Sequence, residues 1–505
     1  MANTDLTPDI AAAPGFDHSY ARLGAEFSTA QPLDPVSRPE VLLWNQALAD
    51  TLGWPANPLS DRDALNALAG NTPLPGSSPI STVYAGHQFG QYNPQLGDGR
   101  ATLLGEWISP SGRRWDIQLK GAGPTPYSRG GDGRSPIGPV IREFLLSEAM
   151  HALGVPTTRA LAAISTGERV MRNRIEPGAV LTRVASSHLR VGTVQYFAMT
   201  RGGEGLETLV NYVVARHFSD QASIDAPACN NPALTLLQGV CEHFAQLAAR
   251  WQVLGFVHGV LNTDNALLCG ETIDYGPCAF MDHFDPGACF SSIDRQRRYA
   301  WPNQPGIMHW NLAVLAECLL TLINGDPDQA QQLAQSVVDQ FPERFHRYHQ
   351  QHMAAKLGLD AITDGDGPLI QSFHDIMAND ALDFTLTFRW LTERATGDLA
   401  HTPLPELFSA PRALEAWAES WHERRNANQG DPETIARTMA SANPVVIPRN
   451  HQVQKAIERA EQGNTQWAQA LVARAATPFV WGSEDLVWAR PPAPEERVTQ
   501  TFCGT

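Results

Sequence analysis

HGVLNTDN (258–265), followed by IDYG (273–276), is the stretch of sequence on which the fold assignment depends. Asn265 and Asp274 stand nine residues apart, so two adjoining loops can present a carboxamide oxygen and a carboxylate to one ion. Hard oxygen ligands suit Mg²⁺ or Mn²⁺, and such ions bridge nucleotide phosphates. We therefore predict a divalent metal site at these two residues, with Asp264 as the nearest carboxylate that can accept a proton.

The order of these residues resembles the catalytic loop of protein kinases, H-R-D-L-x-x-x-N, and the D-F-G that follows it. His258, Leu261 and Asn265 match the histidine, the leucine and the metal-binding asparagine. Asp274 matches the aspartate of D-F-G. Val260, however, stands where a kinase has its catalytic aspartate. Because valine cannot accept a proton, ordinary hydroxyl phosphorylation by that residue is excluded.

A glycine-rich segment precedes a lysine that ends a β-like run. Gly97 and Gly99 allow close approach of the backbone to a ligand, and Arg100 adds a fork suited to phosphate. A plain hairpin turn is the alternative. Lys120 closes WDIQLK, and Glu143 follows 23 residues on, a spacing that resembles the lysine–glutamate pair of kinase folds. A solvated lysine and an unrelated glutamate remain open as the alternative.

A second glycine-rich loop, residues 127–134, lies between that lysine and the expected helix. It is either a flexible linker or a loop that folds over phosphates, with Arg129 and Arg134 supplying positive charge. Arg183 and Arg190, in LTRVASSHLR, are two further candidate cations. Single arginines usually lie at the surface, so these assignments need support from elsewhere.

Composition limits the partners. Lys and Arg number 37 and Asp and Glu number 53, so the formal net charge of the 505 residues is −16. This charge repels phosphate, and we expect binding neither to nucleic acid nor to a membrane. We identify no run approaching the roughly 18 uncharged apolar residues of a membrane span and no signal peptide in MANTDLTPDI. The seven cysteines form no CxxC, which disfavours structural zinc. We expect a cytoplasmic enzyme.

The order of elements predicts an α+β, protein-kinase-like fold with two lobes. Short β-like runs at 101–106, 115–119 and 179–184 alternate with loops and one helix, for which Gly138-Pro139 and Gly154 provide start and stop signals. Further helices are expected at 40–52, 206–218, 234–254, 311–322 and 327–341. The expected divisions are an N-terminal extension at 1–80, a strand-rich N-lobe at 81–205, a helical C-lobe at 206–345 and a helical C-terminal extension at 346–505.

Taken together, the motifs resemble one family, selenoprotein O, the kinase-fold protein adenylyltransferases often described as pseudokinases. The likeness runs from about residue 40 to the C-terminus and is carried by YAGHQFGQYNPQLGDGRA, LKGAGPTPYSRGGDGR, IREFLLSEAMHALGVPTTRAL, GVLNTDNALL, DYGPCAFMD and NPVVIPRNH. It implies transfer of AMP from ATP to Ser, Thr or Tyr hydroxyls of proteins, self-modification included. The nucleotide would be flipped relative to a kinase, so that the α-phosphate meets the acceptor. Transfer of UMP from UTP with manganese is a related reaction of bacterial-type members.

The resemblance also implies roles for individual residues. Glu143 would pair with Lys120, and Asp264 would be the proton acceptor. Asn265 and Asp274 would hold Mg²⁺ or Mn²⁺. The residues that would contact ATP are Gly97, Gly99, Arg100, Lys120, Asp132, Gly133, Arg183, Arg190 and Asp274.

The tail residue Cys503 matches the place where family members carry selenocysteine or cysteine. The resemblance implies a regulatory disulfide between the tail and the lobe that carries D-Y-G, with Cys289 as the preferred partner and Cys278 as the rival. A free thiol without a role is the alternative.

Two other functions remain open. An atypical phosphotransferase is disfavoured by Val260. A catalytically inactive ATP-binding scaffold is disfavoured by the joint presence of Lys120, Glu143, Asn265 and Asp274, because a scaffold needs neither metal ligand.

Overall fold

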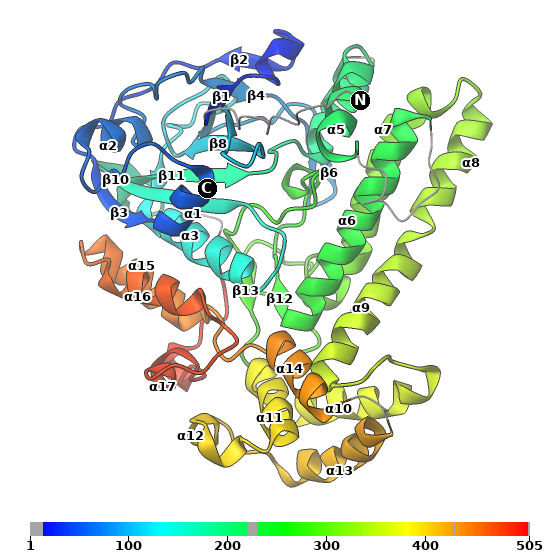
Figure 1. Ribbon diagram of the computed structural model, residues 1–505. Coiled ribbons are helices and arrows are strands. Elements are labelled where there is room, and N and C mark those ends of the chain that lie inside the picture. Colours follow the sequence, from blue (N-terminus) through cyan, green and yellow to red (C-terminus); the bar gives the residue numbers. More distant parts are fainter. Residues whose placement is uncertain (1–13, 202, 220–229, 428–430, 503–505) are drawn as a thin grey trace, which may run out of the picture. The chain divides into compact units, whose positions relative to one another are not determined.

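The computed structural model describes residues 14–201, 203–219, 230–427 and 431–502 (Figure 1). The chain divides into two compact units. Unit 1 comprises residues 1–83, 97–140 and 158–188, and unit 2 comprises residues 84–96, 141–157 and 189–505. The expected α+β class is confirmed, whereas the kinase-like arrangement in two lobes stays a prediction.

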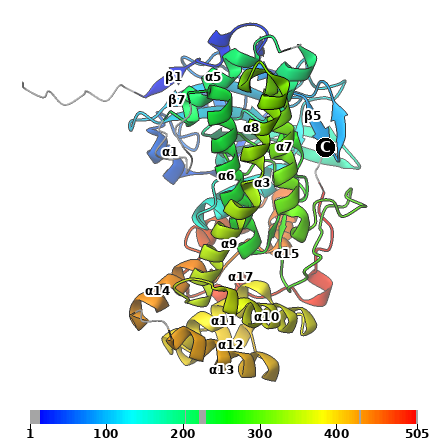
Figure 2. The same ribbon diagram turned by 90° about the vertical axis from the view of Figure 1, so that its right-hand side faces the viewer.

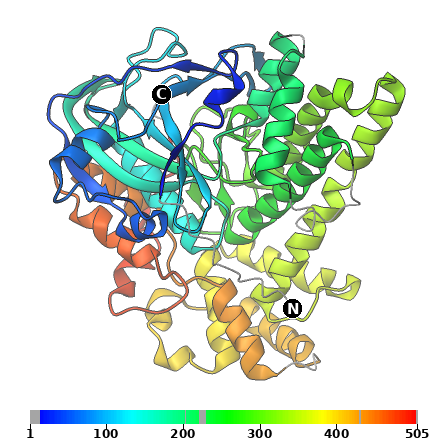
Figure 3. The ribbon, with the colours of Figure 1, turned by 45° about the horizontal axis from the view of Figure 1, so that its top comes forward.

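Unit 1 is built around one antiparallel sheet, whose strands lie side by side in blue to turquoise in Figure 3. In spatial order the sheet contains β2 (Ser28–Ala30), β4 (Ile80–Thr82), β7 (Ala101–Ile108), β8 (Arg114–Lys120), β11 (Ile175–Ala185), β10 (Arg159–Met171) and β3 (Glu40–Trp44). At its margins β1 (Gly15–Asp17) pairs with β7, and β9 (Ser135–Pro136) pairs with β11. The three β-like runs of the sequence are confirmed, and each strand extends beyond the expected run.

Residues 14–80 contribute strands to this sheet. The single helix expected over 40–52 is wrong in its first half, which forms β3 and pairs with β10. The second half forms α1 (Gln46–Leu52), because Asn45 caps it by accepting a hydrogen bond from the amide of Leu48 at 3.0 Å. The helix α2 (Arg62–Leu68) follows, and both helices pack apolar residues against the sheet.

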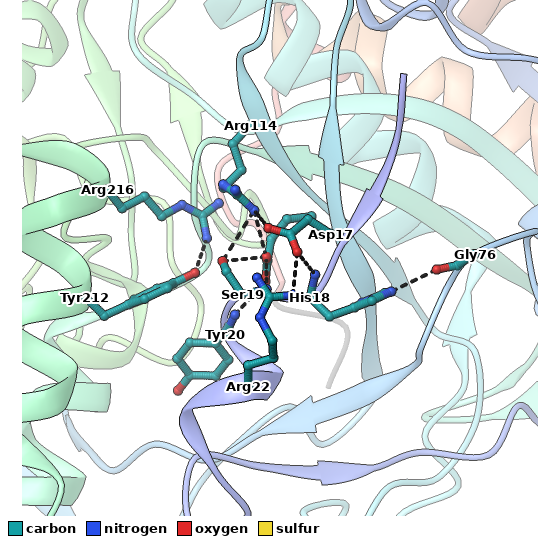
Figure 4. A network of polar contacts seen from close by, with 10 residues as sticks. Asp17, His18, Ser19, Tyr20, Arg22, Gly76, Arg114, Tyr212 and Arg216 are labelled. Carbon is teal, nitrogen blue, oxygen red and sulfur yellow. Dashed lines mark hydrogen bonds and ion pairs between the residues drawn. The ribbon is translucent and has the colours of Figure 1, made fainter. Parts of the chain in front are cut away.

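A polar network attaches the N-terminal segment to β7 (Figure 4). The buried carboxylate of Glu106 accepts hydrogen bonds from the amide of Ser19 at 2.5 Å and from the guanidinium of Arg114 at 3.1 Å. Asp17 accepts hydrogen bonds from Arg22 and Arg114, and these two arginines hold the pKa of the Asp17 carboxyl far below its usual range. Because a buried carboxylate without partners is costly, these bonds specify where the segment docks on the sheet.

The helix α3 (Ile137–Ala152) begins in unit 1 and continues into unit 2. Its bounds confirm the expected helix to within about one residue, and Gly154 has the left-handed φ of +76° that a helix stop requires. Other short elements of unit 2 are β5 (Gly86–Gln88), β6 (Gln91–Asn93), α4 (Val191–Gln195), β12 (Phe256–Val257) and β13 (Ala279–Phe280).

Long helices dominate unit 2, and four of them lie side by side in Figure 2. They are α6 (Pro232–Leu254), α7 (Gln304–Ile323), α8 (Pro327–Val338) and α9 (Phe341–Leu357), and α5 (Leu206–His217) packs on α6. The helices expected at 206–218 and 234–254 are confirmed. The helix expected at 327–341 is wrong at its end, since the chain leaves the helix after Val338 and starts α9 with Pro342 in the first turn.

The helix α7 begins seven residues earlier than the sequence pattern indicated. Residues Trp301–Ile323 are long and apolar enough to cross a membrane by length and composition alone, and an 18-residue window within them has a mean hydropathy of 1.6. That window contains Glu317, so it is not a run of uncharged apolar residues and does not contradict the expectation. Half of that window is buried inside the protein, and α6 and α8 pack against α7. Such packing is typical of the core helix of a bundle.

The rest of unit 2, up to Trp488, is mainly helical and encloses a second apolar core. Its helices are α10 (Gly367–Asn379), α11 (Phe384–Thr396), α12 (Leu404–Leu407), α13 (Arg412–Asn426), α14 (Pro432–Ala442), α15 (Asn450–Glu461), α16 (Gln466–Ala475) and α17 (Asp485–Trp488). In this region the ammonium group of Lys356 lies 4.0 Å from the centre of the Phe388 ring, with the lysine only 2% exposed. It makes no ion pair with the described residues.

A buried arginine joins the segment before α15 to two other parts of unit 2. Arg449 is 0% exposed and donates hydrogen bonds to Asp282 at 2.7 Å, to Asp383 at 2.8 Å and to the carbonyl of Ala489 at 3.0 Å. Burial raises the pKa of the Asp282 carboxyl, and the charge of Arg449 opposes that rise. The motif NPVVIPRNH thus contributes the cation that stabilises the end of DYGPCAFMD.

Candidate active site

Asp264 lies in a short turn, Thr263–Asn265, of unit 2 and is 7% exposed. Its Oδ2 atom accepts a hydrogen bond from Nε2 of Gln88 at 3.1 Å. Its Oδ1 atom is buried and has no hydrogen-bond partner in the described part of the chain. The backbone carbonyl of Asp264 accepts a hydrogen bond from the guanidinium of Arg190 at 2.7 Å. One oxygen of a fixed, buried carboxylate is therefore left to accept a proton.

The surroundings of Asp264 change its pKa. Burial raises the pKa to about 6, the hydrogen bond from Gln88 and the charge of Arg190 oppose that rise, and the charge of Asp274 adds to it. A carboxyl group with a pKa near the working pH is suited to general base catalysis.

Arg190 is the residue around which this part of the site assembles. It stands at the N-terminus of α4 and is buried, with its guanidinium 4.5 Å from the centre of the Tyr84 ring. The same guanidinium lies 3.6 Å from Oδ2 of Asp274. Three residues assigned to the site, Asp264, Asp274 and Arg190, are thus in one cluster within unit 2.

The two expected metal ligands have side chains suited to a hard divalent ion. Asn265 donates a hydrogen bond from Nδ2 to the carbonyl of Val260 at 2.9 Å. Its Oδ1 atom accepts no hydrogen bond from the described residues. Asp274 is partly exposed and has a φ of +62°, unusual for a residue with a side chain. The described ranges contain no group of three or more His, Cys, Asp or Glu side chains placed to hold a metal. An ion held here would therefore rely on phosphate and water oxygens for its other ligands, as Mg²⁺ commonly does.

His258 and Tyr275 fix the backbone on either side of Asp274. A ring nitrogen of His258, Nε2, lies 2.8 Å from the carbonyl oxygen of Ile273, and the amide of His258 donates to Oε1 of Gln304 at 2.8 Å. Burial lowers the pKa of the His258 imidazole. Tyr275 is buried and its hydroxyl is hydrogen-bonded to Thr157. The histidine of this motif therefore has a structural role.

Glu143 is buried in the part of α3 that belongs to unit 2; burial raises the pKa of the Tyr275 hydroxyl, and the charge of Glu143 adds to that rise. Its pairing with Lys120, which belongs to unit 1, stays a prediction.

Two of the expected phosphate-binding cations lie on one face of the unit 1 sheet. Lys120 is the last residue of β8 and pairs with Leu181 of β11, whereas Arg183 pairs with Gln118. Since directly paired residues, and residues two apart, share a face, Lys120 and Arg183 are diagonal neighbours. Arg183 is 2% exposed and donates to Oε1 of Gln118 at 3.3 Å.

The two glycine-rich loops contact each other. Gly97 has a φ of +103°, and a Cβ atom at this position would lie 2.5 Å from the Tyr127 ring. At Gly99 a Cβ atom would lie 2.9 Å from the carbonyl oxygen of Tyr127. Thr125 and Ser128 donate from their hydroxyls to the carbonyls of Asp98 and Gly99, respectively. The close backbone approach that these glycines permit is an approach to the second loop, and a role for Gly97, Gly99 and Arg100 toward ATP stays a prediction.

The acidic residue of the second loop is paired with an arginine. Asp132 accepts two hydrogen bonds from the Arg172 guanidinium, at 2.8 and 2.9 Å, and this arginine lowers the pKa of the Asp132 carboxyl. A Cβ atom at Gly133 would lie 2.0 Å from the carbonyl oxygen of Gly123. Arg134 forms an ion pair with Asp34 at 2.7 Å. Contacts of Asp132 and Gly133 with ATP also stay predictions.

Sequence reasoning missed the hairpin β5–β6, which lies within YAGHQFGQYNPQL. Its residues contact the loop 258–265, here called the catalytic loop by its resemblance to that of kinases, and Gln88 donates a hydrogen bond to Asp264. The sequence offered one signal, Gly90, which accepts the positive φ of a two-residue hairpin turn; Phe89 is not a residue that such turns favour.

Of the two cysteines expected to form a disulfide, Cys503 lies outside the described residues. Cys289 is partly buried, and its thiol lies 3.7 Å from Oδ2 of Asp294; burial raises the pKa of this thiol. The rival, Cys278, is buried and its thiol donates to the carbonyl of Tyr275 at 3.2 Å. The described end of the tail passes close to both, because Thr501 donates hydrogen bonds to the carbonyls of Pro277 and Phe290.

Comparison with known proteins identifies the family of the chain. Residues 12–476 match the family described as protein adenylyltransferase SelO. The chain is 49% identical over 509 residues to the protein nucleotidyltransferase YdiU of Rhizobium leguminosarum bv. trifolii, with 100% of both chains covered. It is 48% identical to the YdiU protein of Rhodopseudomonas palustris, with coverage of 97% and 99%, and 46% identical to that of Maridesulfovibrio salexigens, with coverage of 99% and 100%. The chain therefore belongs to the SelO/YdiU family and is a protein nucleotidyltransferase.

Proposed function

We propose that this enzyme transfers AMP from ATP to Ser, Thr or Tyr hydroxyls of proteins, with its own chain among the candidate substrates. The observation that carries the proposal is the buried carboxylate of Asp264, whose Oδ1 atom has no partner among the described residues, beside Arg190 and Asp274. Val260 occupies the position of the kinase base, so the acceptor must meet a different carboxylate. A kinase-like fold in two lobes is part of the same proposal.

In this reaction the hydroxyl oxygen of the substrate attacks the α-phosphorus of ATP, and Oδ1 of Asp264 takes the proton of that hydroxyl. A new P–O bond joins AMP to the protein, and the bond to the β-phosphate breaks, so that pyrophosphate leaves with the electron pair. Arg190, Lys120 and Arg183 would compensate the phosphate charges. Asn265 and Asp274 would hold Mg²⁺ or Mn²⁺, which when bound neutralises charge on the phosphates.

The nucleotide and the setting complete the proposal. The relatives' names specify nucleotidyl transfer without the base, so UMP transfer from UTP belongs in the same test. We propose that the enzyme acts on proteins in the cytoplasm. A net charge of −16 disfavours nucleic acid and anionic membranes as partners.

A paired labelling assay tests the reaction. The purified, reduced protein is incubated with a candidate protein substrate, Mg²⁺ or Mn²⁺, and ATP labelled at the α- or the γ-phosphate, or α-labelled UTP. We expect label on protein from the α position only, and no transfer by the variant Asp274→Ala. Label from the γ position only would identify a phosphotransferase. No label from any nucleotide would favour the inactive scaffold.

A further inference from the structure

The hairpin β5–β6 is attached to the catalytic loop through consecutive residues on both sides. The amide of His87 donates to Oγ1 of Thr263 at 2.7 Å, and the amide of Phe89 donates to Oδ1 of Asn262 at 3.1 Å. Between these two backbone bonds, the side chain of Gln88 donates to Asp264. All of these residues belong to unit 2. Three consecutive residues of the hairpin thus bind the three consecutive loop residues Asn262, Thr263 and Asp264.

The turn of the hairpin is held in a conformation that costs free energy. Phe89 and Gly90 have φ values of +51° and +81°, the pattern of a type I′ turn. A positive φ is unfavourable for phenylalanine, and the surroundings must compensate for it. They do so through the bond to Asn262 and through the ring of Tyr299, whose centre lies 5.2 Å from that of Phe89. The position of Gln88 is therefore fixed by both the turn and the catalytic loop.

The hairpin also comes as close to Asp264 as a backbone can. At Gly86 a Cβ atom would lie 3.0 Å from both Cβ and Oδ1 of Asp264, tighter than ordinary van der Waals contact. At Gly192, on α4, a Cβ atom would lie 2.2 Å from the carbonyl oxygen of Ala85. Glycines on two sides therefore seat the hairpin between α4 and the catalytic loop.

We propose that Gln88 is a positioning residue for nucleotidyl transfer. Its Nε2 atom holds Oδ2 of Asp264 and Gly86 packs against Oδ1, so the hairpin fixes the orientation of the carboxylate that accepts the proton. Arg190 fixes the backbone of the same residue from the other side, at the carbonyl. The inference rests on the proposed role of Asp264 as the proton acceptor.

The variant Gln88→Met tests this role, because methionine keeps the length of the side chain and cannot donate a hydrogen bond. We expect kcat to fall by about 10-fold to 100-fold while KM for ATP is unchanged, as a misplaced catalytic group predicts. The matched control is Gln91→Met, an exposed residue opposite Gln88 in the same hairpin, which should leave kcat unchanged. A rise in KM with kcat unchanged, or equal losses in both variants, would overturn the proposal.

A double-mutant cycle that combines Gln88→Met with Asp264→Asn tests the positioning role of Gln88 separately from the proposed transfer of AMP. The cycle is measured twice, on kcat and on the free energy of unfolding in urea. If Gln88 acts through Asp264, its substitution costs little further activity once Asp264 is replaced. Absence of coupling in unfolding would refute the contact between the two side chains. Coupling in unfolding with no transfer by the wild-type protein would instead refute the proposed function, and the positioning role with it.

Discussion

The substitution Asp264→Asn keeps the size of a side chain and removes its capacity to accept a proton. We expect kcat to fall by about 10²-fold to 10⁴-fold, the usual contribution of a general base, with ATP binding retained. Labelling from α-labelled ATP measures the rate, and equilibrium binding measures the affinity. Asp328→Asn, an exposed position on α8, is the control and should match the wild-type protein. Full activity in the Asp264 variant would exclude this residue as the base.

Lys356 provides a pH-dependent test of stability. Burial lowers the pKa of its ammonium group from 10.5 to about 7. Between these values the unfolded chain binds a proton that the folded chain does not, so the free energy of unfolding rises from pH 7 toward pH 10. Below pH 7 both states bind the proton, and the full cost of burying the charged ammonium group lowers the free energy of unfolding. Lys356→Met should therefore raise the free energy of unfolding at pH 6 by about 3–5 kcal/mol and by less at pH 10. Urea unfolding at both pH values checks this; Lys455→Met is the control, and an equal effect at both pH values would contradict the argument.

Residues close together in sequence were the ones that sequence reasoning could assign. Asp264 and Asp274 were assigned to one site from their spacing, and the structure places both at Arg190, whereas their roles stay predictions. Gln88 was missed because its hydrogen bond to Asp264 spans 176 positions, and no local pattern reports such a contact. Gly97 and Gly99 were predicted to let the backbone approach a ligand; the structure places Tyr127 of the same unit against both, and an approach to ATP stays a prediction.

Arg449 links the N-terminal end of α15 to the cap of α11 and to the end of the DYGPCAFMD segment. Arg449→Met leaves Asp282 and Asp383 buried without their cation, and we expect a loss of about 3–5 kcal/mol in the free energy of unfolding. The control Arg437→Met breaks an exposed pair with Glu433 and should cost less than about 1 kcal/mol. Equal losses in the two variants would show that the buried network contributes no more to the free energy of unfolding than an exposed ion pair.

The errors in the expected elements have local physical causes. The run 40–52 contains EVLLW, and its pairing with β10 overrides the helical reading. The helix expected at 311–322 lacked the first turns of α7, where Pro305 stands in the first turn, a position at which proline is favoured. Conversely, the long helices α5 and α6 were predicted almost to the residue, because their apolar periodicity extends over several turns.

At the scale of the whole molecule, the tail and the segment after Asp274 meet within unit 2 although more than 200 residues separate them. We expect an oxidised form in which Cys503 is joined to Cys289, since Cys278 is fully buried and already donates to a carbonyl. Mass spectrometry of peptides from non-reduced protein identifies the pair, and the transfer rate with and without dithiothreitol measures its effect. Cys278→Ser should leave the disulfide in place, whereas a pairing lost only in that variant would select the rival cysteine.

The docking of the tail has a consequence for hydrogen exchange. Ser291 pairs with Thr501 as in a parallel sheet, and the amide of Ser292 donates to the carbonyl of Thr501 at 3.1 Å. An amide in such a bond exchanges with deuterium only when the bond opens. The exchange rate at Ser292 therefore reports how often the tail leaves its place. The deuterium uptake of a peptide covering residues 290–295 therefore reports release of the tail without any tag or substitution in the protein.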